Sequence, residues 1–142
     1  EEPFDNRFYS GRKTDGSLVE KSLTDVNEVD GDGKAILDPI TGKQIIRLGL
    51  KSTWVARTKQ TAQEKLNKHD WMIVRNVEKS TAIPSDITTY RDSIRTKCAS
   101  IETAINNCSN LTQFMALFDL PVDSDGNPTG DPAPINDFPD EI

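Results

Sequence analysis

The residues that could carry covalent or metal chemistry are few in this sequence and are widely spaced. His69 is the only histidine, and Cys98 and Cys108 are the only cysteines. A catalytic cysteine needs a histidine beside it as a base, and no local motif brings either thiol to His69. Because His69 stands beside Asp70 at an expected helix end, we assign it to capping that end. The sequence therefore predicts no catalytic residue, and it favours binding over catalysis.

The two cysteines are expected to remain free thiols. Cys98 and Cys108 fall on what the pattern predicts to be one helix, where about 15 Å would separate them. A disulfide bond needs α-carbons much closer together than this. Free thiols are typical of a protein that is made in a reducing compartment.

Acidic turns in the chain match a calcium-binding loop only in part. Asp123, Asp125 and Asn127 have the spacing of the first three ligands of an EF-hand loop. That loop needs glycine at its sixth position and glutamate at its twelfth, where this chain has Pro128 and Pro134. Asp, Asn and Gly are also the ordinary residues of turns. We therefore expect turns here, with no bound metal ion and no other cofactor.

The bulk composition argues against several classes of partner. Hydrophobic residues make up 35% of the chain and aromatic residues 6%, so the core should be small. A mean hydropathy of −0.58 and the lack of a long apolar run predict no membrane-spanning segment. The net charge of −6 disfavours nucleic acid as a partner, because phosphate binding needs clustered Lys and Arg. No secretion signal opens the sequence, and a start at Glu1 rather than Met suggests a missing residue or leader.

Glycine and proline divide the sequence into three parts. All eight glycines lie outside residues 50–125, and five of the eight prolines lie from Pro121 onward. Because these residues interrupt regular structure, we expect a β-rich part over residues 1–50, a helical part over 51–120 and an extended part over 121–142. The fold class predicted in this way is α+β.

The first part has the pattern of a small antiparallel β meander. Asp32-Gly33 is a hairpin dipeptide, and residues 38–42 contain the turn residues of a second reversal. Short apolar stretches flank both turns, at residues 26–29, 35–37 and 45–50. Two or three strands are unstable alone, so we expect this part to pack on a helix or on another subunit.

The second part has the pattern of a helical hairpin followed by a short third helix. A first helix is expected over residues 53–68, then a polar crossing, and then a second helix that starts near Pro84, Ser85 and Asp86. The flank that carries Arg91 and Arg95 is polar and is expected to face water or a partner. The opposite flank carries an apolar stripe at helical spacing: Ile87, Tyr90, Ile94, Cys98, Ile101 and Ile105.

The third helix is expected to begin after Asn110. Asn110 can cap this helix, and Gln113 occupies the position that completes a capping box. Apolar residues, including Phe114 and Phe118, surround the helix, so it should be buried in this chain or against a neighbour. The last part is rich in Pro, Gly and Asp, and its few apolar residues, Phe138 among them, predict a strap laid over another surface.

Aromatic and arginine residues near the hairpin are the candidates for interaction. Trp71 follows Asp70 at the expected end of the first helix, and Tyr90-Arg91 lies one or two turns into the second, which suggests a hairpin clamped by aromatic side chains. Arg91 and Arg95 should pair with acidic groups within the chain or across a subunit contact. The predicted interaction residues are Trp54, Trp71, Tyr90, Arg91, Arg95, Phe114, Phe118 and Phe138.

Residues 55–106 resemble the tail-fibre assembly or tail-assembly chaperone domain of tailed bacteriophages. The resemblance lies in Leu66, Asp70-Trp71, Pro84, Tyr90-Arg91 and Arg95, which follow one another in the order of that family's motif, and loosely in Phe138-Pro139. Residues 1–50 have no counterpart in the short chaperone. They look instead like β-rich modules of marine phage and cyanophage structural proteins that carry the same hairpin.

This resemblance implies a structural protein of the phage virion, in the tail, fibre or baseplate, that acts by protein–protein assembly and is not an enzyme. It would reside in the virion, and in the host cytoplasm during assembly. Its partners would be other phage structural proteins and further copies of itself, with no nucleic acid and no membrane. The alternative is a tail-fibre assembly chaperone that is absent from the mature particle.

Overall fold

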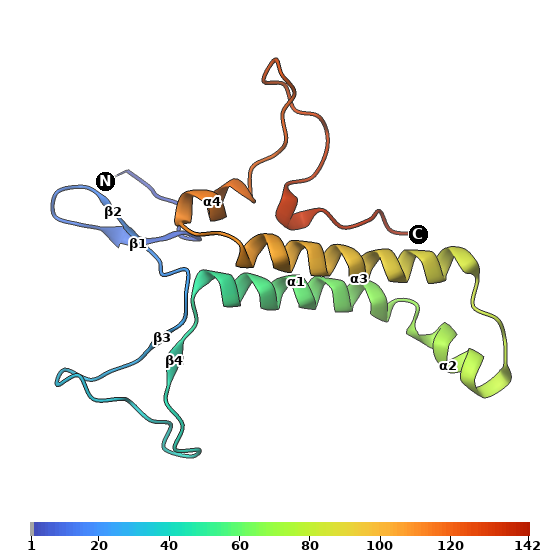
Figure 1. Cartoon of the computed structure of the whole chain (residues 1–142), viewed down its shortest axis with the longest axis horizontal. Helices are drawn as coiled ribbons and strands as arrows, with labels where there is room; N and C mark the ends of the chain where they lie inside the picture. Colours follow the sequence, from blue (N-terminus) through green and yellow to red (C-terminus); the bar gives the residue numbers. More distant parts are fainter. Residues whose placement is uncertain (1) are drawn as a thin grey trace. The chain divides into compact units, whose positions relative to one another are not determined.

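A computed structural model describes residues 2–142 and has the α+β fold class that the sequence predicts. The chain forms two compact units, of which the first ends at Trp54 and the second comprises Val55–Ile142. Figure 1 shows the order of the elements along the chain.

The first unit contains two small antiparallel sheets of two strands each. Strand β1 (Tyr9–Arg12) pairs with β2 (Leu18–Glu20), and β3 (Val26–Asn27) pairs with β4 (Ile46–Arg47). The reversal between β1 and β2 uses Gly16 at φ +90°, a conformation that suits glycine.

Three segments of this unit close into a ring of backbone hydrogen bonds. The amide of Glu28 donates to Ile45, that of Ile45 to Ile36, and that of Ile36 back to Glu28, over 2.8–3.0 Å. The side-chain amide of Gln44 donates to the carbonyls of the same three residues. The sequence correctly predicted these segments and the turns between them. The predicted meander did not include the closed ring. The ring depends on contacts between residues that are distant in the chain.

Close backbone packing joins the β part to the start of helix α1 (Leu50–Asn67). The amide of Gly49 donates to Asp25 at 2.8 Å, and the amide of Leu50 donates to Ser22 at 2.9 Å. A Cβ atom on Gly49 would stand 2.4 Å from the carbonyl oxygen of Leu23, so only glycine fits at this position. Phe8 and Leu50 are the buried apolar side chains of this unit.

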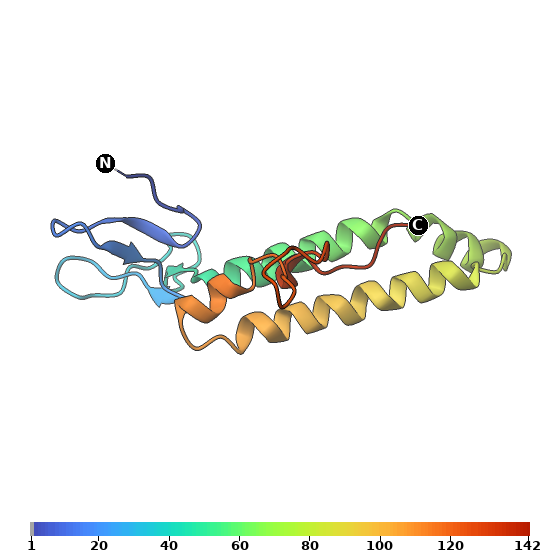
Figure 2. The same ribbon diagram turned by 90° about the horizontal axis from the view of Figure 1, so that it is seen from above.

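In the second unit, α1 and α3 (Ser85–Asn106) run antiparallel and lie side by side in both views (Figures 1 and 2). The predicted stripe on α3 is confirmed, because all of its isoleucines and Tyr90 are buried and Cys98 is half-buried. Helix α1 begins three residues earlier than predicted and ends at Asn67. Pro84, rather than Ser85, occupies the N-cap position of α3, without a side-chain hydrogen bond.

The short helix α4 (Leu111–Ala116) begins as the sequence predicted. The side chain of Asn110 accepts a hydrogen bond from the amide of Gln113 at 2.9 Å, and Gln113 accepts one from the amide of Ser109. Leu111 and Phe114 are buried. The predicted cap by Asn110 is confirmed, whereas the return bond of Gln113 goes to the residue before the N-cap and not to the N-cap amide of a capping box.

The polar crossing predicted after Asp70 is wrong, because residues Asp70–Lys79 form helix α2. Asp70 lies in the first turn and Lys79 in the last, where each charge is favourable to the helix dipole. The helix ends where Ser80 adopts a left-handed conformation at φ 55° and its amide donates to Asn76. The hairpin is therefore a pair of long helices joined through a third, short one.

The C-terminal part is an extended strap, as predicted, but the surface that it covers belongs to the same chain. A 3-10 turn, η1 (Pro134–Asn136), buries Ile135, whose amide donates to Leu117 at 3.0 Å. Phe138 packs on the cluster formed by Ala62, Tyr90 and Ile94. Figure 2 shows this strap running along the α1–α3 pair. None of the helices in the described part of the chain is both long and apolar enough to cross a bilayer.

Candidate functional site

Arg91 joins the three helices of the hairpin at one point. Its guanidinium donates to the carbonyl of Leu66 near the end of α1 at 2.5 Å and to the carboxylate of Asp70 at the start of α2 at 2.9 Å. Arg91 is only 6% exposed, so of the two settings predicted for its flank, water or a polar partner, Arg91 has the second. Its pairing with an acidic group within the chain is confirmed.

Two buried polar atoms lie beside this junction without a hydrogen-bond partner among the described residues. They are the hydroxyl of Tyr90 and Nδ1 of His69, whose rings meet edge to face at 5.8 Å between centroids. His69 immediately precedes α2 and occupies its N-cap position without a side-chain capping bond. A role in capping the end of the first helix stays a prediction. Burial raises the pKa of the Tyr90 hydroxyl above its ordinary value, and the nearby Glu141 carboxylate adds to this.

Helix α2 presents an apolar face to solvent. Trp71 is 54% exposed, and Val74 and Val77, one and two turns further on, are 55% and 78% exposed. No residue of the helix is buried. Arg75 lies over the Trp71 ring at 4.7 Å, so the ring is shielded by a cation and not by the hairpin. The expectation that Trp71 clamps the hairpin is therefore wrong, and its position suits contact with another molecule.

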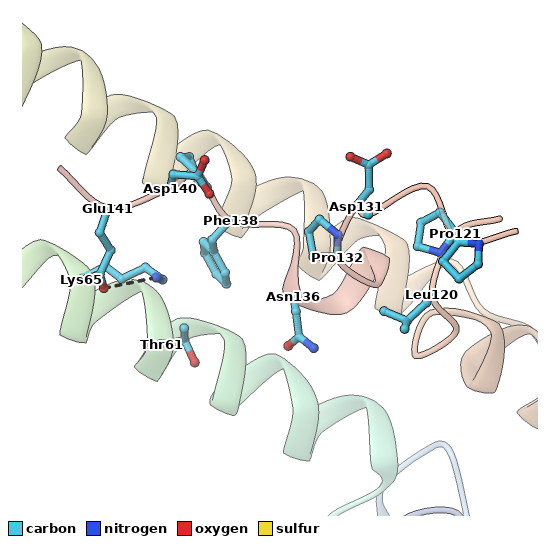
Figure 3. A pocket seen from close by; sticks show the side chains of 13 residues that line it. Thr61, Lys65, Leu120, Pro121, Asp131, Pro132, Asn136, Phe138, Asp140 and Glu141 are labelled. Atoms are coloured by element: carbon cyan, nitrogen blue, oxygen red, sulfur yellow. Dashed lines mark ion pairs between the residues drawn. The ribbon is translucent and has the colours of Figure 1, made fainter. Parts of the chain in front are cut away.

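The strap and α1 line an open groove of about 670 Å³ (Figure 3). Lys65 of α1 and Phe138 of the strap face each other across it, with the Lys65 ammonium 5.8 Å from the ring centroid. Leu120 and four prolines supply most of its apolar lining: Pro121, Pro128, Pro132 and Pro139. The groove thus depends on the strap being docked.

Ion pairs hold the end of the strap to both long helices. Glu141 pairs with Lys65 of α1 at 3.6 Å and with Lys68, in the turn just after α1, at 2.5 Å. Asp137 pairs with Lys97 of α3 at 3.1 Å. The hydrogen bond from Lys68 lowers the pKa of Glu141 and raises that of Lys68. Because these groups are partly exposed, solvent screens each ion pair. The pairs therefore determine the position of the strap more than they contribute to its stability.

The first unit also exposes apolar side chains on its ring of three segments. Ile40, at the tip of the second turn, is 93% exposed. The others are more than one-third exposed: Val29, Ile36, Leu37, Ile45, Ile46 and Leu48. Exposed apolar groups gathered in one small unit are typical of interaction surfaces.

The structure places the remaining predicted site residues in different settings. Phe114 is fully buried, with the half-buried Phe118 ring 5.3 Å away. Trp54 is half-buried on α1. Arg95 is exposed and pairs with Asp92 one turn earlier at 3.1 Å. Of the eight predicted residues, Tyr90 and Arg91 are thus neighbours at the junction of the hairpin, and Phe138 packs on the same core cluster.

Val74 and Val77 were not predicted as interaction residues. Two features of the sequence could have predicted a helix here. Trp71, Val74 and Val77 are spaced three residues apart, and no Gly or Pro occurs between Asp70 and Ser80. The interpretation of Asp70-Trp71 as a helix end hid this pattern.

Two acidic turns, which begin at Asp30 and Asp123, form by the same pattern of hydrogen bonds. Asp30 accepts from the amides of Asp32 and Lys34, and Asp123 accepts from those of Asp125 and Asn127. These bonds account for Asp at the first position of each turn. Within residues 2–142 no three His, Cys, Asp or Glu side chains are grouped so that they could hold a metal ion.

No protein-family model, curated protein or solved structure matches this chain. The assignment of function therefore depends on the chain's own surfaces and on the motif resemblance of residues 55–106.

Proposed function

We propose that this chain is a structural protein of a bacteriophage virion, in the tail, fibre or baseplate, and that it binds other protein chains rather than catalysing a reaction. The observation that carries the proposal is the exposed apolar face of α2. A ten-residue helix with Trp71, Val74 and Val77 on its surface gains nothing from leaving them in water. Trp is also among the residues enriched at the centres of protein interfaces.

The way α2 is held supports its use as a binding element. Arg91 fixes the first turn of α2 through Asp70, while the remainder of the helix has no buried residue. A partner would therefore meet a preformed helix and would not have to order it, which lowers the entropic cost of binding.

Four residues of the phage resemblance lie together in the structure, which supports the proposal. Leu66, Asp70, Tyr90 and Arg91 are separated by up to 25 positions, yet they meet at the junction from which α2 projects. Two other motif residues, Trp71 and Arg95, are exposed and lie outside this junction, so the shared position concerns part of the motif. Partners of the proposed kind are other phage structural proteins and further copies of this chain.

The alternative is a tail-fibre assembly chaperone that leaves before the particle matures. The observation that favours it is the same projecting α2 face, because a chaperone must offer apolar surface to an unassembled client. The β-rich first unit has exposed apolar groups of its own, which favours a component that stays in the virion and contacts more than one partner.

Mass spectrometry of purified particles tests the proposal and separates the two roles. A virion component should be present in stoichiometric amounts, and the phage that carries Trp71→Ser should yield particles depleted of this chain. A chain that is abundant in infected cells, absent from particles and co-purified with unassembled fibre protein would instead be the chaperone. Absence from particles without any such complex would overturn both.

A further inference from the structure

The end of the strap, residues 133–141, is a separate binding element that we call the docking segment. Its buried anchors are Ala133 and Ile135, and Phe138 adds a half-buried ring against Ala62 and Tyr90. Two of its three acidic residues pair with lysines: Asp137 with Lys97 of α3, and Glu141 with Lys65 of α1 and with Lys68 just after α1. The segment therefore complements its site in both shape and charge.

The docking segment is attached through a connector that packs against little. Every residue from 122 to 132 is exposed. Asp123 folds this connector into a turn by accepting from the amides of Asp125 and Asn127, and the amide of Thr129 donates to Pro121. The turn keeps the ends of the connector close together. When open, its eleven residues could span about 36 Å.

We propose that the docking segment exchanges between copies, so that the segment of one chain occupies the α1–α3 site of another. Exchange preserves each contact that the segment makes, because donor and acceptor are the same sequence. The difference in free energy between the closed and exchanged states lies mainly in the connector and in the entropy of association. High local concentration, as in a growing assembly, favours the exchanged state by mass action.

A second copy fits the site better than an unrelated protein. The site presents Lys65, Lys68 and Lys97 around an apolar cluster. The complementary order of apolar and acidic groups occurs in this chain's own residues 133–141. An unrelated partner would have to reproduce that order and also compete with a tethered segment of high effective concentration.

Reversal of the charges on each side of the contact tests the exchange in the 142-residue chain. One variant carries Lys65→Glu, Lys68→Glu and Lys97→Glu, and the other carries Asp137→Lys and Glu141→Lys. Each chain alone repels its own segment. When the two are mixed, the reversed site can take the reversed segment and the unaltered site can take the unaltered one.

Native mass spectrometry should find each variant mainly monomeric and the mixture enriched at least tenfold in the 1:1 dimer. A chain with all five reversals is the control, because it restores the attraction within one molecule, and its Ile135 amide should regain protection from hydrogen exchange. A mixture that stays monomeric while this control is protected would overturn exchange. A control that is not protected would overturn the docking on which exchange depends. Neither result bears on the virion role, which particle composition tests separately.

Discussion

Arg91 of α3 and Asp70 of α2 form an ion pair whose two ends lie in different environments. The Arg91 side chain is 8% exposed, whereas that of Asp70 is 48% exposed. The guanidinium also donates to the Leu66 carbonyl near the end of α1, which accepts a longer bond, of 3.2 Å, from the amide of His69 as well. Arg91 therefore binds the end of α1 and the start of α2 at the same time, and the burial of its charge is offset by two directed hydrogen bonds.

Substitution of Arg91 with Ala should destabilise the second unit by about 2 kcal/mol, because hydrogen bonds to a charged group are lost and space is left inside the junction. Arg95→Ala is the matched control, since Arg95 lies one turn away in an exposed pair with Asp92 and should change stability by less than about 0.5 kcal/mol. Urea denaturation followed by circular dichroism measures both. Equal losses for the two variants would contradict the role of Arg91 as the joint of three helices.

Trp71→Ala should lower the free energy of unfolding by less than about 1 kcal/mol, because more than half of the side chain is already in water. Phe114→Ala should cost about 3–5 kcal/mol, because that ring is fully buried. Thermal or chemical denaturation of the two variants gives the comparison. If the free energy of unfolding fell as much for Trp71→Ala as for Phe114→Ala, Trp71 would belong to the core. The α2 face would then not be a contact surface.

Local features of the fold could be predicted from the sequence. The isoleucines of α3 repeat at helical spacing, and Asn110 and Gln113 stand at the two positions of a capping box, so each feature depends only on near neighbours. Asp30 and Asp123 likewise set their turns through amides two and four residues onward. These predictions succeeded because the stabilising groups lie within one or two turns of each other.

The site depends on contacts that periodicity does not detect. Arg91 meets Leu66 across 25 positions, and Lys97 meets Asp137 across 40. A charge on the polar flank of a helix faces water by default, and only the fold shows that Arg91 is covered. The docking of the C-terminal strap was missed for the same reason, since its scattered apolar residues have no period of their own.

Tyr90→Phe should leave stability unchanged or raise it by up to about 1 kcal/mol, because the buried hydroxyl lacks a partner among the described residues. The raised pKa of Tyr90 makes a second prediction about alkaline pH. The unfolded chain ionises near pH 10 while the folded chain stays protonated, so Tyr90 causes stability to fall as pH rises from there. Denaturation across pH 9–11 should show a weaker decline in the phenylalanine variant. An identical decline in both proteins would count against burial of the hydroxyl.

Acid should shift the docking segment modestly toward its undocked state, because the ion pairs that would be lost are screened by solvent and the apolar anchors remain. The pKa of Glu141 is lowered, chiefly by the hydrogen bond from Lys68, so its contribution is present above the unfolded value of about 4.5 and is lost as pH falls through the folded one. The methyl resonance of Ile135, followed by nuclear magnetic resonance between pH 7 and 3, should move toward its undocked position. Glu141→Gln should flatten this change. If the glutamine variant followed the same curve as the parent, another acidic group would govern docking.

Strain in the connector should favour exchange between copies. Gly126 sits at φ +82° in the turn that closes the connector, and valine there costs about 1–2 kcal/mol of backbone strain. Opening two such turns in an exchanged dimer relieves that strain twice, so Gly126→Val should raise the dimerisation constant at least about tenfold. Gly33→Val is the matched control, because Gly33 has φ +80° in the similar turn of the first unit, and a Cβ at either glycine meets nothing within 4 Å. Sedimentation equilibrium measures both constants. An increase that is equal in the two variants would mean that strain destabilises the monomer in general, and the connector would then have no special part in association.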